Sequence, residues 1–224
     1  GGNSRQEAQR QLRNAEVICA TCIGSGSDVL QNFRFHTVLV DECTQATETA
    51  VLVPIAQGCQ QLILVGDHCQ LPPTVVSDIA MERGLAVSLF SRLADQNLQP
   101  VLLDTQYRMH PVIAEFPSNG FYAGRLLSGV GIRDRMPPLG FPWPSVGTPV
   151  AFVNVGDKDS RAEETRDGNS YVNHYEVQKV MWALQMVLSR GDVEGGIDGV
   201  GIITPYSGQV RAIRSAVRTR AALK

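Results

Sequence analysis

The most informative shortage in this 224-residue sequence is lysine, because only three of its 20 basic residues are lysines. These are Lys158, Lys179 and Lys224, and none of them follows a glycine or precedes a serine or threonine. The phosphate-binding loop of the P-loop NTPases, G-x-x-x-x-G-K-[ST], is therefore absent from the sequence. Any nucleotide chemistry that the sequence suggests must be assigned to other residues.

Other shortages exclude broad classes of protein. No apolar run approaches the roughly 20 residues of a transmembrane helix, and the start, Gly1 to Ser4, has no signal-peptide pattern. Five cysteines are a sparse, odd set, which favours reduced thiols in the cytoplasm or nucleus. Because the sequence has 20 basic and 22 acidic residues, a polybasic protein is excluded. We expect a soluble protein whose nucleic-acid contacts, if it has any, form a local patch.

Short apolar runs alternate with helical patterns along the chain. We expect strands at 17–21, 37–40, 61–65, 100–103, 151–155 and 200–203. We expect helices at 4–15, 45–56, 87–95, 174–188 and 208–223, and loops at 66–78, 129–149 and 157–169. Continuous apolar runs such as 37–40 are typical of parallel strands covered on both faces. The alternation predicts an α/β fold with parallel sheets, which restarts after residue 104 as two incomplete lobes, 1–104 and 105–224.

The first chemical signal is a pair of acids, Asp41 and Glu42, at the end of an apolar run. This is the Walker B arrangement, in which a rigid strand end lets the aspartate hold Mg²⁺ and the glutamate activate the attacking water. A second interpretation stays open at this stage. The two acids could be solvated at the end of the strand, or could cap the next helix along the chain.

Two more loops offer groups that suit a nucleotide. Gly66 lets the backbone pass close to a phosphate and Gln70 offers an amide, both at a strand end of the kind where parallel sheets bind nucleotides. Tyr107 and Arg108 offer an aromatic face for a base and a guanidinium for phosphate oxygens. The alternatives are an ordinary turn that ends in prolines for the first loop, and a structural pair at a helix start for the second.

Five segments in order resemble motifs of superfamily 1 helicases of the nonsense-mediated-decay type, the up-frameshift or regulator-of-nonsense-transcripts family. They are DECTQATE (41–48), GDHCQLPP (66–73), QYRMHP (106–111), FPSN (116–119) and GIITPYSGQ (201–209). The resemblance extends from about residue 14 to residue 210, and implies two RecA-like lobes that use ATP to move along RNA and unwind it. Pro72-Pro73 departs from it toward sister helicases, and Cys43 replaces a more usual serine or alanine.

The resemblance also implies roles for individual residues. At the catalytic centre it implies that Asp41 holds Mg²⁺ through water, that Glu42 is the hydrolytic base and that Gln70 senses the γ-phosphate. It implies that Tyr107 stacks on the adenine and that Arg108 is an arginine finger. Further contacts with the nucleotide are implied for Gln45, Gly66 and Asp67. At the RNA backbone it implies Thr21, Thr204 and Tyr206.

The implied cofactors are ATP and Mg²⁺. The implied partners of this monomer are single-stranded RNA or DNA, together with mRNA-decay and translation-termination factors. Because the phosphate-binding loop is missing, we expect a fragment of the motor that does not hydrolyse ATP by itself. Two alternatives stay open, namely a sister DNA/RNA helicase and a non-catalytic nucleic-acid-binding fragment.

Three further patterns are given no functional role. The Cys19-x-x-Cys22 spacing has no second pair at the distance of a zinc ribbon. It also lies at the end of an apolar run, where small buried cysteines are common, so no metal or redox role is expected. His68 and Cys69 are explained by the helicase-like loop that contains them. The arginines of 208–223 are typical of a solvated helix face more often than of an RNA-binding surface.

Overall fold

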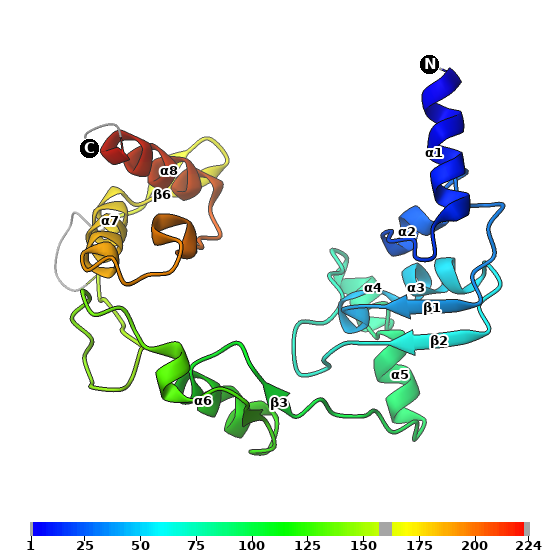
Figure 1. Ribbon diagram of the computed structural model, residues 1–224, viewed down its shortest axis with the longest axis horizontal. Coiled ribbons are helices and arrows are strands. Elements are labelled where there is room, and N and C mark those ends of the chain that lie inside the picture. Colours follow the sequence, from blue (N-terminus) through cyan, green and yellow to red (C-terminus); the bar gives the residue numbers. More distant parts are fainter. Residues whose placement is uncertain (1, 157–162, 222–224) are drawn as a thin grey trace. The chain divides into compact units, whose positions relative to one another are not determined.

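The computed structural model describes residues 2–156 and 163–221 (Figure 1). The chain divides into two compact units, Gly1–Leu102 (unit 1) and Leu103–Lys224 (unit 2). Each unit combines helices with a small parallel sheet, which confirms the predicted mixed α/β class. The assignment of residues 1–104 and 105–224 to two RecA-like lobes stays a prediction.

Unit 1 is built around two parallel strands. Its elements are α1 (Gly2–Asn14), α2 (Cys22–Ser25), β1 (Thr37–Val40), the 3-10 turn η1 (Cys43–Gln45), α3 (Glu48–Ile55), β2 (Gln61–Leu64), α4 (Asp78–Glu82) and α5 (Leu89–Asp95). β1 and β2 lie side by side (Figure 1) in a register that runs from Thr37 opposite Gln61 to Val40 opposite Leu64. The predicted strands 37–40 and 61–65 and their parallel pairing are confirmed.

The core of unit 1 covers one face of β1. Val38 and Val40 are buried with Val51 of α3 and Leu89 of α5, whereas Leu39 between them is 60% exposed. The expectation of a strand covered on both faces is therefore wrong for the described residues. Burial alternates along β1, as it does in a strand with a single packed side.

Four predicted strands do not form within the described residues: 17–21, 100–103, 151–155 and 200–203. Strands need neighbours whose backbone N–H and C=O groups pair with their own, and none pairs with these runs in the described ranges. Their apolar side chains are open to solvent, as shown by Val101 at 89%, Phe152 at 89% and Ile203 at 97% exposure. An apolar run therefore overpredicts strands where no paired neighbour is present.

Unit 2 combines a short parallel pair with an antiparallel hairpin. Its elements are β3 (Thr105–Gln106), α6 (Pro111–Phe121), β4 (Leu127–Ser128), the 3-10 turn η2 (Ile132–Arg135), β5 (Thr165–Asp167), β6 (Ser170–Val172), α7 (His174–Leu188), the 3-10 turn η4 (Gly196–Gly199) and α8 (Ser207–Ala221). β3 pairs with β4 in parallel, and β5 with β6 in antiparallel fashion. The predicted helix 174–188 is confirmed, and the predicted helix 208–223 is confirmed over its described residues, which end at 221. No helix in the described ranges is long and apolar enough to cross a membrane.

Two predicted loops of unit 2 differ from the structure. Residues 157–162 of the expected charged loop lie outside the described residues, and 165–167 form β5 instead of a loop. The expected surface excursion 129–149 is in part packed, because Phe141 is buried and its ring centroid lies 5.7 Å from that of Trp182 in α7. Proline and glycine mark turns, but they do not show which aromatic side chain between them finds a partner.

Candidate functional site

The ends of β1 and β2 meet at one edge of the sheet of unit 1. The Val65 N–H donates to the Val40 carbonyl at 2.9 Å, and the Cys43 N–H donates back to the Val65 carbonyl at 2.9 Å. The loop of Asp41 and Glu42 therefore lies against the loop that begins at Gly66. The structure brings these two segments together as the sequence predicts for the carboxyl ends of parallel strands.

Thr44, which the sequence analysis did not single out, joins the two loops. Its hydroxyl donates to the Asp67 carbonyl at 3.1 Å and accepts from the Asp67 N–H at 3.2 Å, and the residue is 3% exposed. The approach is so close that a Cβ on Gly66 would lie 3.0 Å from the Thr44 backbone nitrogen. The only sequence signal was the position of Thr44 inside the segment DECTQATE.

The two acids of this edge are exposed and partly oriented. Glu42 adopts the left-handed conformation at φ 51° and ψ 36°, which is costly for a residue with a side chain. Its N–H donates to Asp41 Oδ1 at 3.0 Å, and its Oε2 accepts from Gln45 Nε2 at 3.1 Å. Within the described residues, Asp41 Oδ2 and Glu42 Oε1 receive no hydrogen bond. One oxygen of each carboxylate is thus available to a cation or a water.

Gln70 is turned toward its own loop. Its Nε2 donates to Asp67 Oδ2 at 2.8 Å, while Asp67 Oδ1 accepts from the Cys69 N–H at 3.0 Å. Ligand atoms of Asp67, His68 and Cys69 also lie within 4.8 Å of one another. These are successive residues of one turn, and the bonds to Asp67 already account for its orientation. His68 stacks on Phe90 with ring centroids 6.1 Å apart.

The thiol of Cys43, the residue after Asp41 and Glu42, has a raised proton affinity. Cys43 is fully buried, and this desolvation raises the pKa of its thiol. The negative charges of Asp41 and Glu42 raise it further. The thiol is therefore held in its neutral form and packs as an apolar group in the core of unit 1.

In unit 2, Tyr107 and Arg108 lie in the loop between β3 and α6. Both are exposed, Tyr107 by 64%, and the Tyr107 ring lies so close to Gly129 that a Cβ there would be 2.2 Å from it. The Arg108 guanidinium has no polar partner in the part of the chain that the structure describes. The loop thus presents an aromatic ring and a free guanidinium.

His110 is a second residue that the sequence analysis missed. It is 4% exposed and is the N-cap of α6, where its Nδ1 accepts from the Val112 N–H at 3.1 Å. Its Nε2 is buried and has no hydrogen-bond partner among the described residues. Histidine is an uncommon cap, so the spacing in QYRMHP gave no indication of this role.

The three predicted RNA contacts lie in exposed or half-exposed turns. Thr21, in unit 1, is the N-cap of α2 and accepts from the Gly24 N–H at 3.0 Å. In unit 2 the Thr204 hydroxyl accepts from the Tyr206 N–H at 3.5 Å, and the Tyr206 ring meets Tyr171 edge-on at 5.6 Å. Each threonine thus has a local structural role, and its contact with RNA stays a prediction.

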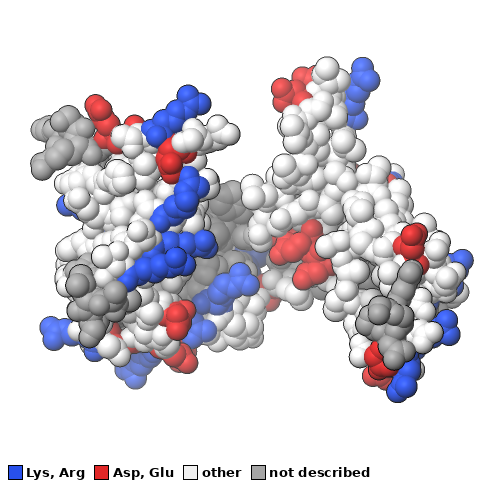
Figure 2. All heavy atoms as spheres, turned by 90° about the horizontal axis from the view of Figure 1, so that it is seen from above, with Lys and Arg blue, Asp and Glu red and all other residues white. Residues whose placement is uncertain are grey.

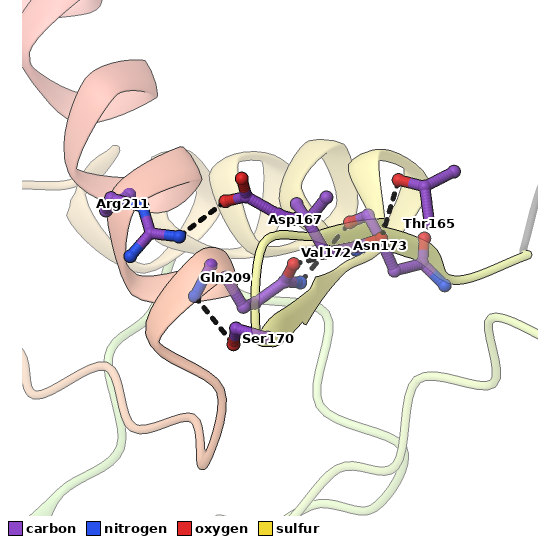
Figure 3. A network of polar contacts seen from close by, with 8 residues as sticks. Thr165, Asp167, Ser170, Val172, Asn173, Gln209 and Arg211 are labelled. Atoms are coloured by element: carbon purple, nitrogen blue, oxygen red, sulfur yellow. Dashed lines mark hydrogen bonds and ion pairs between the residues drawn. The ribbon is translucent and has the colours of Figure 1, made fainter.

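A buried polar network fixes the start of α8, directly after Thr204 and Tyr206 (Figure 3). Gln209 is 4% exposed, and its Oε1 accepts from the Asn173 N–H at 2.9 Å. Its Nε2 donates to the Asn173 carbonyl at 3.3 Å and to Glu176 Oε2 at 3.2 Å. Gln209 therefore ties the segment GIITPYSGQ to the first turn of α7, a contact that sequence periodicity does not indicate.

Arginines are the only charged residues of α8. Lys and Arg atoms form a row on the face of unit 2 that carries this helix (Figure 2), which has no acidic residue. Arg211 pairs with Asp167 of β5 at 2.6 Å. Arg214 and Arg218 are exposed and have no partner within the described ranges. The solvated helix face that the sequence predicts thus carries a local positive patch.

Known proteins are similar to this chain over most of its length. A family model described as AAA domain matches residues 85–224, and a second one with the same description matches residues 2–78. The regulator of nonsense transcripts 1 homolog of Arabidopsis thaliana is 44% identical over 92% of this chain and 16% of its own length. The ATP-dependent helicase NAM7 of Saccharomyces cerevisiae is 42% identical over 88% of this chain and 20% of its own length. The chain therefore spans about a fifth or less of these relatives.

Proposed function

Because the chain belongs to the AAA-domain family and is related to the regulator of nonsense transcripts 1 helicases, we propose that it forms part of an ATP-dependent RNA helicase motor. The observation that carries the proposal is the junction of the Asp41–Glu42 loop with the Gly66–Asp67 loop through Thr44. This junction puts two partly free carboxylates at the strand edge where parallel sheets bind nucleotides.

The donor set of this edge suits Mg²⁺. Asp41 Oδ2 accepts no hydrogen bond from the residues that the structure describes. Mg²⁺ is a small, hard cation that prefers exposed carboxylates with room for water ligands. Asp41 would hold the ion through water, and the ion would neutralise charge on the phosphates. Glu42 would take the proton of the attacking water on Oε1, while the Gln45 amide fixes the orientation of the carboxylate.

The other predicted residues take roles around this centre. Gln70 and Asp67 would respond to the terminal phosphate, and Gly66 allows close approach of the backbone. Tyr107 would stack on the adenine, and Arg108 would stabilise charge on the transferred phosphoryl group. RNA would be held without sequence readout by Thr21, Thr204 and Tyr206, since contacts to the sugar–phosphate backbone do not distinguish bases.

In this proposal the motor works as a monomer in the cytoplasm or nucleus, with mRNA-decay and translation-termination factors as partners. Its activity needs a phosphate-binding loop, which supplies the main positive surroundings of the triphosphate. We call a protein that holds this chain together with such a loop the complete motor. The 224-residue chain by itself is expected not to hydrolyse ATP. RNA-stimulated phosphate release by the purified chain would contradict that expectation.

The test of the function is Glu42→Gln in the complete motor. This change keeps the size of the side chain and its bond to Gln45 but removes the base. Hydrolysis of ATP in the presence of RNA should fall by about 10²-fold or more, while nucleotide binding survives. Glu16→Gln, which alters an exposed acid of unit 1, is the matched control. Hydrolysis near the parental rate would show that Glu42 is a capping acid, and lost binding would show a structural role.

A sister helicase that acts on DNA is the second candidate, and the departure at Pro72-Pro73 favours it. RNA and DNA of the same sequence differ at most backbone contacts only in the 2′-hydroxyl. Competition between the two for the complete motor, read as stimulation of ATP hydrolysis, distinguishes the candidates. Stimulation by RNA at concentrations where DNA has no effect supports the RNA motor, and the reverse result supports the sister helicase.

A further inference from the structure

The loop that carries Tyr107 and Arg108 is held from inside by the side chain of Gln106. Gln106 Oε1 accepts from the N–H groups of Arg108 at 2.9 Å and Met109 at 2.7 Å. Its Nε2 donates to the Met109 carbonyl at 3.0 Å and to Ser128 Oγ at 2.9 Å. A carboxamide has two acceptor lone pairs and two N–H donors, so Gln106 uses its full capacity here.

The same loop is held on its carbonyl side by Arg135 of η2. Arg135 Nε donates to the Arg108 carbonyl at 3.1 Å, and Nη2 donates to the Tyr107 carbonyl at 2.8 Å. Its Nη1 donates to the Asp134 carbonyl at 2.8 Å. All three guanidinium nitrogens thus bind backbone carbonyls, and no carboxylate pairs with Arg135 within the described ranges. A planar fork fits two successive carbonyls in a way that a lysine ammonium does not.

This arrangement fixes the backbone of the loop but does not hold the guanidinium of Arg108. The two carbonyls and the Arg108 N–H are bonded, whereas the Arg108 guanidinium has no polar partner among the described residues. A reactive or binding group on a fixed backbone is pre-organised, because less freedom is lost when it meets its ligand. We call the hydrogen bonds of Gln106 and Arg135 to this loop the clamp. Arg135 lies in 129–149, the segment that the sequence predicts as a surface excursion.

We infer that Arg135, together with Gln106, is a positioning residue that sets the place of the Arg108 guanidinium and the Tyr107 ring for ATP hydrolysis. The inference rests on the proposed function. Arg135 acts through the loop backbone and does not touch the nucleotide. Loss of the fork lets the loop move, and a displacement of about 1 Å at a phosphate-binding group can lower a rate by about 10²-fold.

The kinetic test compares Arg135→Gln and Arg135→Lys in the complete motor, with Arg133→Gln of the same 3-10 turn as the matched control. Arg135→Gln should lower kcat about 10- to 100-fold and raise KM for ATP. Arg135→Lys should rescue little, since it keeps the charge but lacks the fork. In an Arg108→Ala background, Arg135→Gln should lower kcat by less than about twofold and should still raise KM for ATP, because only the Tyr107 ring is left for Arg135 to position.

Several outcomes would overturn the inference. If Arg135→Gln multiplies the loss in the Arg108→Ala background, Arg135 acts on the nucleotide directly and is not a positioning residue. If Arg135→Lys restores the parental kcat, the charge matters and the fork does not. If Arg108→Ala alone leaves kcat unchanged, the proposed role of Arg108 is wrong. The clamp is then tested separately, by a measurement that does not involve ATP.

That measurement is amide hydrogen exchange, followed by NMR in the 224-residue chain. Arg135→Gln should speed exchange of the Arg108 and Met109 amides by about tenfold or more. The Ser25 amide of unit 1, which donates to the Thr21 carbonyl at 2.9 Å, should be unchanged. Unchanged exchange at Arg108 and Met109 would overturn the clamp whatever happens to turnover.

Discussion

The two units hold their candidate site residues by different means. In unit 1 the strand ends of β1 and β2 are bonded backbone to backbone, and the buried Thr44 hydroxyl adds two bonds between the loops. In unit 2 the strands near the site have only two residues each, and side chains hold the loop through backbone groups. A sheet edge places residues by topology, whereas a clamped loop depends on a few individual side chains. Single substitutions should therefore act differently in the two units.

The largest effect is expected for Arg108 in unit 2. In the complete motor, Arg108→Ala should lower kcat by about 10²–10³-fold, because in its proposed role the guanidinium stabilises charge that develops in the transition state. Arg108→Lys should lower it nearly as much, since lysine lacks the fork. The melting temperature should hardly change, because the guanidinium has no polar partner among the described residues. Turnover assays and thermal unfolding on the same preparations check this prediction.

The opposite result, a loss of stability with little loss of activity, would mean that Arg108 has a structural role like that of Thr44 in unit 1. If Arg108→Lys keeps most of the activity while both variants lose stability, then Arg108 ties the QYRMHP turn to its surroundings and is no finger.

The next effect is expected for Gly66 in unit 1. Gly66→Ala puts a Cβ about 2.9 Å from Cys43 Sγ and 3.0 Å from the Thr44 backbone nitrogen, and a buried backbone cannot yield cheaply. Overpacking of this kind costs about 1–3 kcal/mol, measured as the free energy of unfolding in urea. Gly120→Ala is the control, since Gly120 lies in α6 with no atom within 4 Å of its added Cβ. It should be neutral or slightly stabilising. Equal losses at both positions would show that the junction is not tight.

Local patterns in the sequence predicted part of the fold, whereas contacts with partners far along the chain escaped prediction. β1, β2 and their parallel pairing are indicated by apolar runs, and the strand ends bring the loop of Asp41 against the loop that begins at Gly66. By contrast, Arg135 bonds to carbonyls 27 and 28 residues away, and no periodicity encodes such a contact. The four missing strands fail for the same reason, because a strand is defined by a neighbour that the run itself does not contain.

A smaller effect is expected for the buried cap of α6 in unit 2. His110→Ala removes the acceptor of the Val112 N–H and should cost about 0.5–2 kcal/mol of unfolding free energy, the usual range for a lost N-cap. His110→Asn should recover a large part of that loss, because asparagine is among the best caps. Urea unfolding of the 224-residue chain measures both. An asparagine variant as unstable as the alanine variant would show that packing of the ring, and not capping, makes His110 important.

The smallest effect is expected for the ion pair between α3 and α5 in unit 1, where Arg92 donates to both carboxylate oxygens of Glu48 at 2.6 and 2.8 Å. The hydrogen bonds and charge of Arg92 lower the pKa of Glu48 below its ordinary value. A lowered pKa in the folded state means that the pair stabilises the protein at pH values above the ordinary carboxyl pKa of about 4.3, and that this contribution is lost as the pH falls through the lowered value. Glu48→Gln should therefore lower the melting temperature by only a few degrees at pH 7, since an ion pair whose side chains are 43% and 28% exposed contributes little. The difference from the parental chain should shrink below about pH 4 and in high salt.

Glu82→Gln, an exposed acid of α4, serves as the control and should show no such dependence. A difference that persists at pH 2 would mean that Glu48 acts through packing, and that the contact between α3 and α5 does not depend on charge.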